Sequence, residues 1–450
     1  MASNNAFFGI LDVSLGIITI PCLPTIVAEW VALIPLAIHL ASYQDDYITT
    51  GNISLLGRLP ASLFPALGTF SNLVRFLEQG AGYLDYASMK GGFSQKAWDV
   101  NWGSAFPVAN GAASASIISF LTKKRRPATV KIDALANPTP SSPASSVRST
   151  QEAEKASNIK YRPQVLNIYN FDRVDEKRQK RQLLRYMLSQ IRALRIFQAL
   201  QVLVLIGLCV FFIISGAFGT AAIVLIRVIS EIFIHSITIH RPVGYLKNNE
   251  THDACMLVAA HENAMEWHLY VGDRGIVDTL LNKPMIVPPE GRMARMAALW
   301  FRCAHGGQLI AMTFVAAQKG WDGVCLIILL AAHYIFCWLC GRDALVSNWM
   351  EREEIEVKVG SFELSGRHAV MGAIQILSGT KIDHWMDSII IPHPRRDFWL
   401  ESLMLPEDHS APCPKELNEF DEQRVKRDVV MAREAVRLIK QHMLSLAEVV

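Results

Sequence analysis

The most constraining feature of this sequence is an uncharged stretch, residues 196–226, that runs from Arg195 to Arg227. As one helix these 31 residues would be about 46 Å long, well beyond the roughly 30 Å hydrocarbon core of a bilayer. The segment 215–219, Ser-Gly-Ala-Phe-Gly, is suited to a turn. We therefore expect two apolar helices, 196–214 and 218–239, with one tilted helix followed by a polar helix as the alternative.

Four further stretches are apolar: residues 6–42, 100–122, 293–318 and 324–340. The first contains Pro21, Pro24 and Pro35, so it predicts either one kinked span or a short helical hairpin. Charged residues make up only 19% of the chain, whereas a soluble domain carries about 25%. The sequence therefore predicts an all-α membrane protein, a polytopic helical bundle of about six spans, and excludes a wholly soluble, disordered or disulfide-stapled chain.

The apolar stretches and the charges between them divide the chain into four regions. We expect an N-terminal membrane region (1–122), a basic linker with a juxtamembrane helix (123–195), the main transmembrane bundle (196–340) and a small cytoplasmic tail (341–450). In the tail, Ile355, Val357 and Val359 alternate with charged residues and predict a short strand, and residues 367–377 predict a helix.

The linker 123–195 carries 17 Lys and Arg against 6 Asp and Glu, a net charge of +11. Loops this basic stay on the cytoplasmic side of a membrane, which places the linker and the tail in the cytoplasm. We expect the linker to bind anionic lipid headgroups of the bilayer, and its charge beside a membrane requires no nucleic acid. The sequence does not decide between the endoplasmic reticulum and the plasma membrane.

The final helix, within residues 415–448, has an apolar seam that advances by steps of four and three. Its members are Val425, Val429, Ala432, Val436, Ile439, Met443 and Leu446. Such a seam is typical of a coiled coil. It predicts docking either onto the rest of the protein or onto a partner helix.

Arg227, Glu231 and His235 follow one another at intervals of four, so a helix presents them on one face. Charged residues within an apolar helix usually face a cavity or a partner. The three therefore predict a substrate or ion pathway, and an internal Arg–Glu ion pair is the alternative.

The stretch from His252 to Asp278 is the densest group of titratable residues near the apolar segments, and residues 251–271 read as a helix. Within it His261, Glu262, Glu266 and His268 are the candidates for general acid–base catalysis. The zinc pattern His-Glu-x-x-His is absent, because Met265 stands at the second ligand position. A solvated helix is the alternative.

A second candidate cluster consists of soft nitrogen and sulfur ligands near the ends of two expected spans: Cys303, His305, His333, Cys337 and Cys340. Together they predict a transition-metal site. Small buried hydrophobic cysteines are the alternative. The sequence indicates no particular cofactor.

In the tail, His393-Pro394-Arg395-Arg396 forms a basic loop near His384 and Asp387. This loop is suited to contact phosphates or lipid headgroups. An ordinary surface loop is the alternative.

Residues 261–284, and above all Tyr270-Val-Gly-Asp-Arg-Gly275, resemble uncharacterised multi-pass membrane proteins of filamentous fungi. The resemblance implies a fungal membrane protein and assigns no catalytic residue. Three functions stay open: a membrane-embedded enzyme acting on a lipophilic small molecule, a channel or transporter, and a scaffold that binds partners through its last helix.

Overall fold

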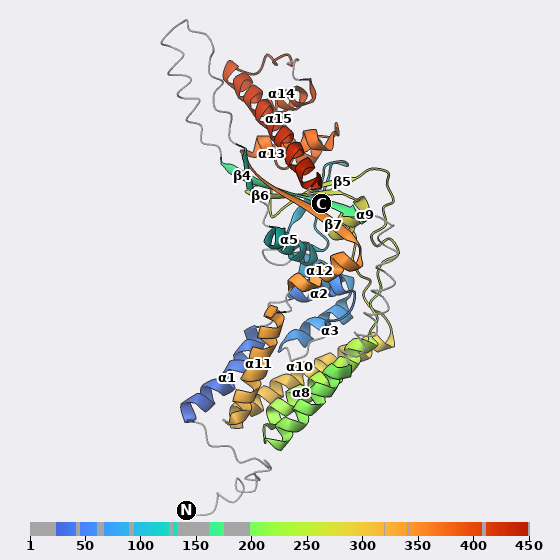
Figure 1. Ribbon diagram of the computed structural model, residues 1–450, viewed down its shortest axis with the longest axis vertical. Coiled ribbons are helices and arrows are strands. Elements are labelled where there is room, and N and C mark those ends of the chain that lie inside the picture. The colour runs from blue at the N-terminus through green and yellow to red at the C-terminus, as the bar shows by residue number, and fades with distance from the viewer. Residues whose placement is uncertain are drawn as a thin grey trace, which may run out of the picture. The chain divides into compact units, whose positions relative to one another are not determined.

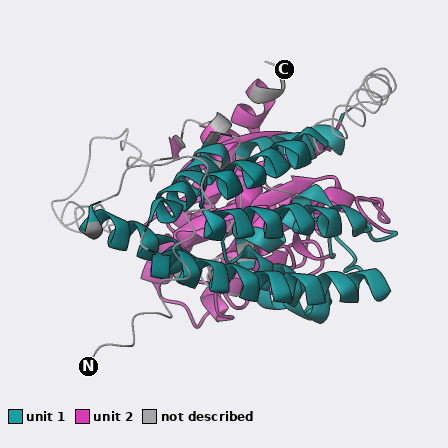
Figure 2. Ribbon diagram, turned by 90° about the horizontal axis from the view of Figure 1, so that it is seen from below, with its two compact units in different colours: residues 1–88, 174–243, 284–353 teal, residues 89–173, 244–283, 354–450 magenta. Residues whose placement is uncertain are grey.

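The structure is a computed structural model that describes residues 24–41, 46–60, 67–89, 94–125, 129–132, 162–174, 199–318, 320–339, 342–406 and 411–448. The chain forms two compact units (Figures 1 and 2). Unit 1 comprises residues 1–88, 174–243 and 284–353, and unit 2 comprises residues 89–173, 244–283 and 354–450. Each unit is thus assembled from three separate segments of the chain.

Unit 1 is helical. Its elements are α1 (Thr25–Ala41), α2 (Asp46–Leu56), α3 (Thr69–Gln79), α4 (Ala81–Met89), an apolar helix over Ala199–Ile214, α8 (Phe218–Ser236), α10 (Arg292–Gln318), α11 (Trp321–Leu339) and α12 (Arg342–Arg352). The expected break between two apolar helices at 215–217 is confirmed. Asp322 of α11 fixes the start of α8, because its carboxylate accepts hydrogen bonds from the backbone amides of Gly219 and Thr220, each at 2.7 Å.

Unit 2 is built on a seven-stranded mixed sheet in the order β2-β1-β5-β6-β4-β7-β3. The strands are β1 (Lys96–Asp99), β2 (Ser104–Pro107), β3 (Thr129–Ile132), β4 (Pro163–Arg173), β5 (Ala254–Ala259), β6 (Glu266–Gly272) and β7 (Ile355–Ser365). The pairs β4–β6 and β3–β7 are parallel, and the other pairs are antiparallel. Its helices are α5 (Gly111–Arg125), α9 (Arg274–Leu281), α13 (Arg367–Ser378), the short 3₁₀ helix η3 (His384–Met386), α14 (Pro394–Met404) and α15 (Glu419–Glu448).

The two faces of this sheet follow from alternation along the strands. On β4, Leu166 and Ile168 belong to the large core shared with α13, α14 and α15. Tyr169 and Phe171 are also buried, and their rings contact that of Tyr270 with centroids 5.6 and 5.5 Å apart. Since neighbouring side chains of a strand point to opposite faces, β4 is covered on both sides.

The prediction of an all-α, six-span membrane bundle is wrong, since unit 2 is organised by a sheet. Residues 251–271, expected as a helix, form β5 and β6, and the expected span 100–122 forms β2 and then α5. Short apolar runs do not distinguish a buried strand from a buried helix, and this ambiguity caused the error.

The multi-pass assignment also fails. Within the described residues only α8 is both long enough and apolar enough to cross a membrane, and 56% of its apolar window is buried inside the protein. Three shorter apolar helical stretches are described: Ile26–Leu40, Ala199–Ile214 and Trp321–Phe336.

The described units do not follow the four predicted regions. Residues 163–173, expected within the basic linker, form β4, an interior strand between β6 and β7, and residues 244–283 belong to unit 2 rather than to a helical bundle. Of the remaining linker, residues 123–125 end α5 and 129–132 form β3, while residues 126–128, 133–161 and 175–195 lie outside the described residues.

The strand and the helix expected early in the tail are confirmed as β7 and α13. The seam of α15 packs within unit 2: Val425, Val429, Ala432, Val436 and Ile439 are all buried in the core. Docking onto the protein itself, one of the two expectations for this helix, is what the structure contains.

Candidate ligand-binding site

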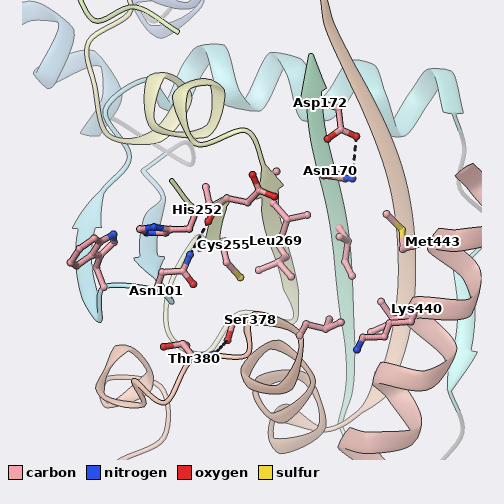
Figure 3. Close-up of a pocket in the computed structure, with 18 residues that line it drawn as sticks. Asn101, Asn170, Asp172, His252, Cys255, Leu269, Ser378, Thr380, Lys440 and Met443 are labelled. Carbon is pink, nitrogen blue, oxygen red and sulfur yellow. Dashed lines mark hydrogen bonds between the residues drawn. The ribbon is translucent and has the colours of Figure 1, made fainter. Parts of the chain in front are cut away.

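Unit 2 contains a cavity of about 730 Å³ between the sheet, the C-terminal end of α13 and α15 (Figure 3). A cavity of this size suits a drug-sized molecule. The residues that line it come from β4, β5, β6, the β1–β2 turn and both helices: Asn101, Trp102, Ile168, Asn170, Asp172, His252, Asp253, Ala254, Cys255, Leu269, Val271, Gly272, Leu377, Ser378, Thr380, Ile439, Lys440 and Met443.

The floor of the cavity is apolar because alternate strand positions face it. Ile168 of β4, Cys255 of β5 and Leu269 of β6 are buried and line it from the sheet. Ile439 and Met443, one turn apart on α15, line it from the helix side. Burial raises the pKa of the Cys255 thiol to about 12, with the Asp99 carboxylate adding to the effect. At neutral pH this sulfur is a small apolar group rather than a nucleophilic thiolate.

The rim of the cavity is polar and predominantly acidic. Asp172 and Asp253 are among its lining residues, which include one lysine, Lys440 of α15. Burial raises the pKa of Asp172 above its ordinary value, Lys358 opposes this shift, and the carboxylates of Asp253, Glu356 and Asp273 add to it. Such a rim favours a ligand that brings positive charge or hydrogen-bond donors.

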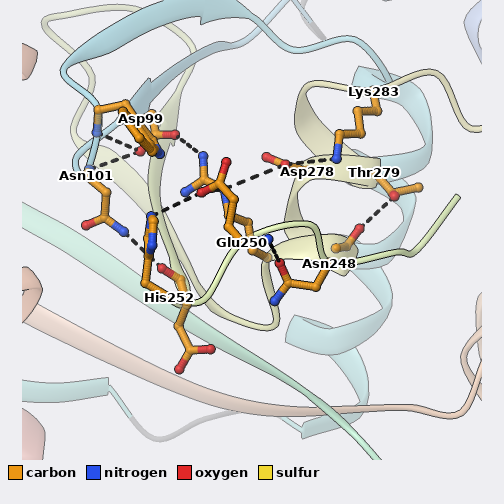
Figure 4. A network of polar contacts seen from close by, with 12 residues as sticks. Asp99, Asn101, Asn248, Glu250, His252, Asp278, Thr279 and Lys283 are labelled. Carbon is orange, nitrogen blue, oxygen red and sulfur yellow. Dashed lines mark hydrogen bonds and ion pairs between the residues drawn. The ribbon is translucent and has the colours of Figure 1, made fainter. Parts of the chain in front are cut away.

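A buried ionic network supports one side of this rim (Figure 4). Arg274, at the start of α9, lies 2.8 Å from Asp99 Oδ2, 2.9 Å from Glu250 Oε2 and 3.7 Å from Asp278 Oδ2. Lys283 Nζ lies 3.2 Å from the same Asp278 oxygen. Two cations therefore face three carboxylates, and of these five side chains Arg274, Asp99 and Asp278 are almost fully buried.

The network reaches the cavity through three rim residues. The Glu250 carboxylate holds His252 Nε2 at 3.1 Å, and Asp99 Oδ1 accepts a hydrogen bond from the backbone amide of Asn101 at 3.0 Å. The Asn101 side chain in turn donates to the Asp253 carbonyl at 2.9 Å. The β1–β2 turn and the segment before β5 are thus fixed against each other, which gives the rim a defined shape.

Gly272 closes the end of β6 beside the cavity. Its φ is +105°, and a Cβ added there would lie 2.2 Å from the Phe171 carbonyl oxygen of β4. Only glycine combines this backbone conformation with so close an approach of two strands.

Comparisons with protein-family models, with curated proteins and with solved structures gave no match. The resemblance to fungal membrane proteins therefore stays a prediction. The function of the chain has to be argued from the geometry of its own residues.

The predicted pathway residues lie on α8 in unit 1. Arg227 and Glu231 are buried and form an ion pair, and His235 Nε2 lies 3.8 Å from Glu231 Oε2. The structure thus brings all three together. The contact between Arg227 and Glu231 corresponds to the internal ion pair that the sequence offered as the alternative to a pathway.

The predicted acid–base residues are separated by the strands that carry them. His261 and Glu262 lie in the β5–β6 turn, where Glu262 pairs with Lys96 at 2.8 Å. That hydrogen bond lowers the pKa of Glu262. Glu266 and His268 alternate on β6 with the cavity-lining residues, so they lie on the opposite face of the sheet. His268 contacts Tyr169 there, with 3.4 Å between Nδ1 and the hydroxyl.

The predicted metal cluster is not supported by the part that the structure describes. Cys303 is exposed on α10, and His305 stacks on His39 with ring centroids 4.8 Å apart. His333 lies on α11, the side chain of Cys337 is not described and Cys340 lies outside the described residues. Among described residues, no group of three or more His, Cys, Asp or Glu side chains is placed to hold a metal ion.

Sequence reasoning missed the cavity because it assigned residues 163–173 to a linker. The signal was present in that segment. Ile168, Asn170 and Asp172 recur at intervals of two, the period of a strand face, and all three line the cavity. Two further rim residues, His252 and Asp253, lie in the stretch that the sequence singled out for its titratable groups, although that stretch was predicted to be helical.

Proposed function

We propose that this protein binds an amphiphilic small molecule in the cavity of unit 2, with an apolar chain over the floor and an amine or other hydrogen-bond-donating head at the acidic rim. The observation that carries the proposal is the division of one cavity of about 730 Å³ into an apolar floor and an acidic rim. Binding sites of small molecules share this plan of an apolar wall with a few placed polar groups.

The geometry supports binding more than catalysis. The sulfur that lines the cavity, Cys255, is held as a thiol by burial, and the imidazole at the rim, His252, is bound by Glu250. A nucleophile paired with a base is not among the described lining residues. The sequence favoured a lipophilic small molecule as the ligand. We keep this class of ligand but assign it to cavity residues that the sequence analysis did not name as catalytic candidates.

The test compares two ligands of equal chain length and opposite charge, n-octylamine and octanoate, by isothermal titration calorimetry on the full chain. We expect octylamine to bind and octanoate to bind at least tenfold more weakly. The substitution Asp172→Asn should reduce octylamine affinity about tenfold, because the loss of one partly buried ion pair is worth about 1.4 kcal/mol. Equal binding of the two ligands would overturn the acidic-head assignment.

A matched pair of tryptophans tests whether the ligand occupies this cavity. Met443→Trp fills the cavity from α15 and should abolish octylamine binding. Leu444→Trp, the adjacent and exposed position, does not line the cavity and should bind like the unmodified protein. Loss of binding in both variants, or in neither, would remove the cavity from the proposal.

A second proposal concerns unit 1, whose helices expose large apolar side chains to a degree that a soluble surface rarely shows. Ile26 and Trp30 of α1 are 73% and 68% exposed, Ile310 of α10 is 71% exposed, and Trp338 of α11 is 82% exposed. At the start of α10, Arg292 and Arg295 accompany exposed methionines, a combination typical of a lipid interface. We infer that unit 1 contacts a lipid bilayer through these helix faces.

Co-sedimentation with liposomes of phosphatidylcholine and phosphatidylserine tests the lipid contact. The unmodified protein should sediment with the vesicles, and the double substitution Trp30→Glu/Leu33→Glu should leave it in the supernatant. Leu444→Glu is the control, because it changes an equally exposed leucine in unit 2. If the double variant sediments unchanged, these faces do not contact lipid.

The transport and scaffold alternatives have less support. Arg227 and Glu231 form an ion pair in the interior of unit 1, whereas a pathway residue needs access to its ion. The apolar seam of α15 is covered by α13 and β7, so a helix partner at 415–448 would have to use the polar faces.

A further inference from the structure

A second cavity of unit 2, of about 40 Å³, lies where α13, α14 and α15 meet. It is lined by His368, Ile390, Ile391, His393, Arg395, Arg396, Trp399, Val425 and Asp428. One buried water needs roughly 10–15 Å³ of such space, so the cavity has room for a group of several heavy atoms. The basic loop that the sequence singled out, His393 to Arg396, forms one of its walls.

Three of these side chains are almost fully buried and carry polar atoms that lack a hydrogen-bond partner within the described residues. The atoms are Arg396 Nε, Trp399 Nε1 and Asp428 Oδ1. The exposed fractions are 4% and 6% for the Arg396 and Asp428 side chains, and 1% for Trp399. A buried polar atom without a partner costs about 1–3 kcal/mol. Three such atoms around one cavity point to a ligand that forms hydrogen bonds with all three.

The surroundings of the cavity are positively charged. Arg424, Arg427 and Arg395 act electrostatically on Asp428, and Arg367 acts on His368. The acids on this side are fewer: besides Asp428 itself, Asp421 pairs with Arg395 at 3.2 Å, and Asp387 pairs with Arg396 at 2.6 Å. The cavity also lies at the amino-terminal end of α14, where the helix dipole is positive. An anion is therefore favoured.

The donors for such an anion are side chains rather than backbone amides. His393 already accepts hydrogen bonds from the amides of Arg395, Arg396 and Asp397. Arg396 is itself fixed by donating to the carbonyls of Ile390 and Asp383, at 3.0 and 3.1 Å. Its Nε–H and the indole N–H of Trp399 are the groups left to bind a ligand.

The hydrogen-bonding character of these three atoms restricts which anion can bind. Arg396 Nε and Trp399 Nε1 only donate, and an ionised Asp428 only accepts. The ligand must therefore offer acceptor oxygens together with one hydroxyl proton. Hydrogen phosphate does so, because it keeps one hydroxyl proton throughout the neutral range. A phosphate monoester does so in its singly protonated form, which is about one molecule in ten at pH 7 since its second pKa is near 6. Sulfate does not, because it carries no proton at neutral pH.

We propose that this cavity binds the phosphoryl group of inorganic phosphate or of a phosphate monoester. Arg396 and Trp399 donate to its oxygens, and Asp428 accepts the hydrogen bond of its hydroxyl group. The site is independent of the amphiphile cavity and of the lipid contact.

The test is isothermal titration calorimetry of the full chain at pH 7 with inorganic phosphate, glycerol 3-phosphate, dimethyl phosphate and sulfate. We expect phosphate or glycerol 3-phosphate to bind, and dimethyl phosphate and sulfate to bind at least tenfold more weakly. Binding of phosphate alone identifies the free ion as the ligand, and stronger binding of glycerol 3-phosphate identifies a monoester. Absence of binding by both, or equal binding of sulfate, would overturn the proposal.

Two substitutions in the lining test whether phosphate binds at this site. Trp399→Phe removes one donor and should weaken phosphate binding about tenfold. Asp428→Asn replaces a pure acceptor by an amide that also donates, so sulfate should gain affinity relative to phosphate. Asp421→Asn, which alters the partner of Arg395 but does not line the cavity, should leave the selectivity unchanged. An unaltered preference for phosphate in Asp428→Asn would place the ligand elsewhere.

Discussion

Arg274 Nη2 lies 2.8 Å from Asp99 Oδ2, and the two side chains are only 6% and 4% exposed. This ion pair joins the start of α9 to the end of β1, two elements 175 residues apart in the chain. Because Arg274 also binds Glu250 and Asp278, one guanidinium holds three carboxylates that border the candidate ligand site.

We therefore predict that Arg274→Ala destabilises the protein strongly. Removing one partner of a buried ion pair leaves uncompensated charge and costs about 3–5 kcal/mol. Arg173→Ala is the matched control: Arg173 pairs with Asp273, but its side chain is half exposed, so the loss should be about 1 kcal/mol or less. Urea unfolding followed by tryptophan fluorescence measures both. Equal losses in the two variants would show that the network is not stabilising.

Gly272 and Gly291 allow the cost of a steric clash to be separated from the cost of backbone strain. Both have nearly the same φ, +105° and +104°, but only at Gly272 would a Cβ meet another strand. Gly291→Ala should cost about 1–2 kcal/mol from the backbone alone. Gly272→Ala should cost clearly more, because β4 and β6 must also move apart. Thermal unfolding of the two variants measures the difference. Similar melting temperatures for both would refute the predicted clash at Gly272.

The two cysteines Cys255 and Cys303 should differ sharply in reactivity. With a pKa of about 12, about one Cys255 thiol in ten thousand is ionised at pH 8, and the side chain is buried. Cys303 is exposed. Iodoacetamide treatment of the native protein followed by peptide mass spectrometry should find Cys303 alkylated and Cys255 unmodified. After unfolding in urea both should react, and rapid labelling of native Cys255 would contradict its placement.

The sequence predicted the long apolar helices of unit 1 well, but not α2, α3, α4 or α12, and it predicted the site poorly. Long apolar runs such as those of α10 and α11 form helices almost regardless of context. Their bounds were therefore predicted to within a few residues. Residues 251–271 contain two apolar runs of strand length, and only pairing with β1 and β4 selects the strand. Ile168 and Ile439 line the same cavity although they lie 271 residues apart in the sequence, and no local pattern predicts that meeting.

The pair of His368 and Asp428 predicts a distinctive dependence of stability on pH in phosphate-free buffer. Burial lowers the pKa of His368 to about 4 and raises that of Asp428 to about 6, and nearby arginines add to the first shift and oppose the second. Between pH 4 and 6 the unfolded state binds more protons at the histidine, and the folded state binds more at the aspartate. The histidine thus makes stability rise with pH in this range, and the aspartate makes it fall.

The two slopes should largely cancel in the unmodified protein. Asp428→Asn should therefore give a stability that rises steeply from pH 4 to 6.5, whereas His368→Gln should give one that falls from pH 4 to 6. A shift of about two pKa units corresponds to at most about 3 kcal/mol over the range. Urea unfolding at intervals of half a pH unit measures these slopes. Parallel profiles for the two variants would contradict the assignment.

Arg227 and Glu231 test whether the charges on α8 are structural or form a pathway. If their ion pair is structural, Arg227→Met or Glu231→Gln alone breaks a buried contact between charges and should cost about 3–5 kcal/mol. The double substitution Arg227→Met/Glu231→Met replaces the pair by apolar side chains, and its stability should return to within about 1 kcal/mol of the original. A pathway residue behaves otherwise, because a charge that faces water is lost at little cost to folding. Single variants with unchanged melting temperatures would therefore reject the structural assignment and restore the pathway that the spacing of these residues first suggested.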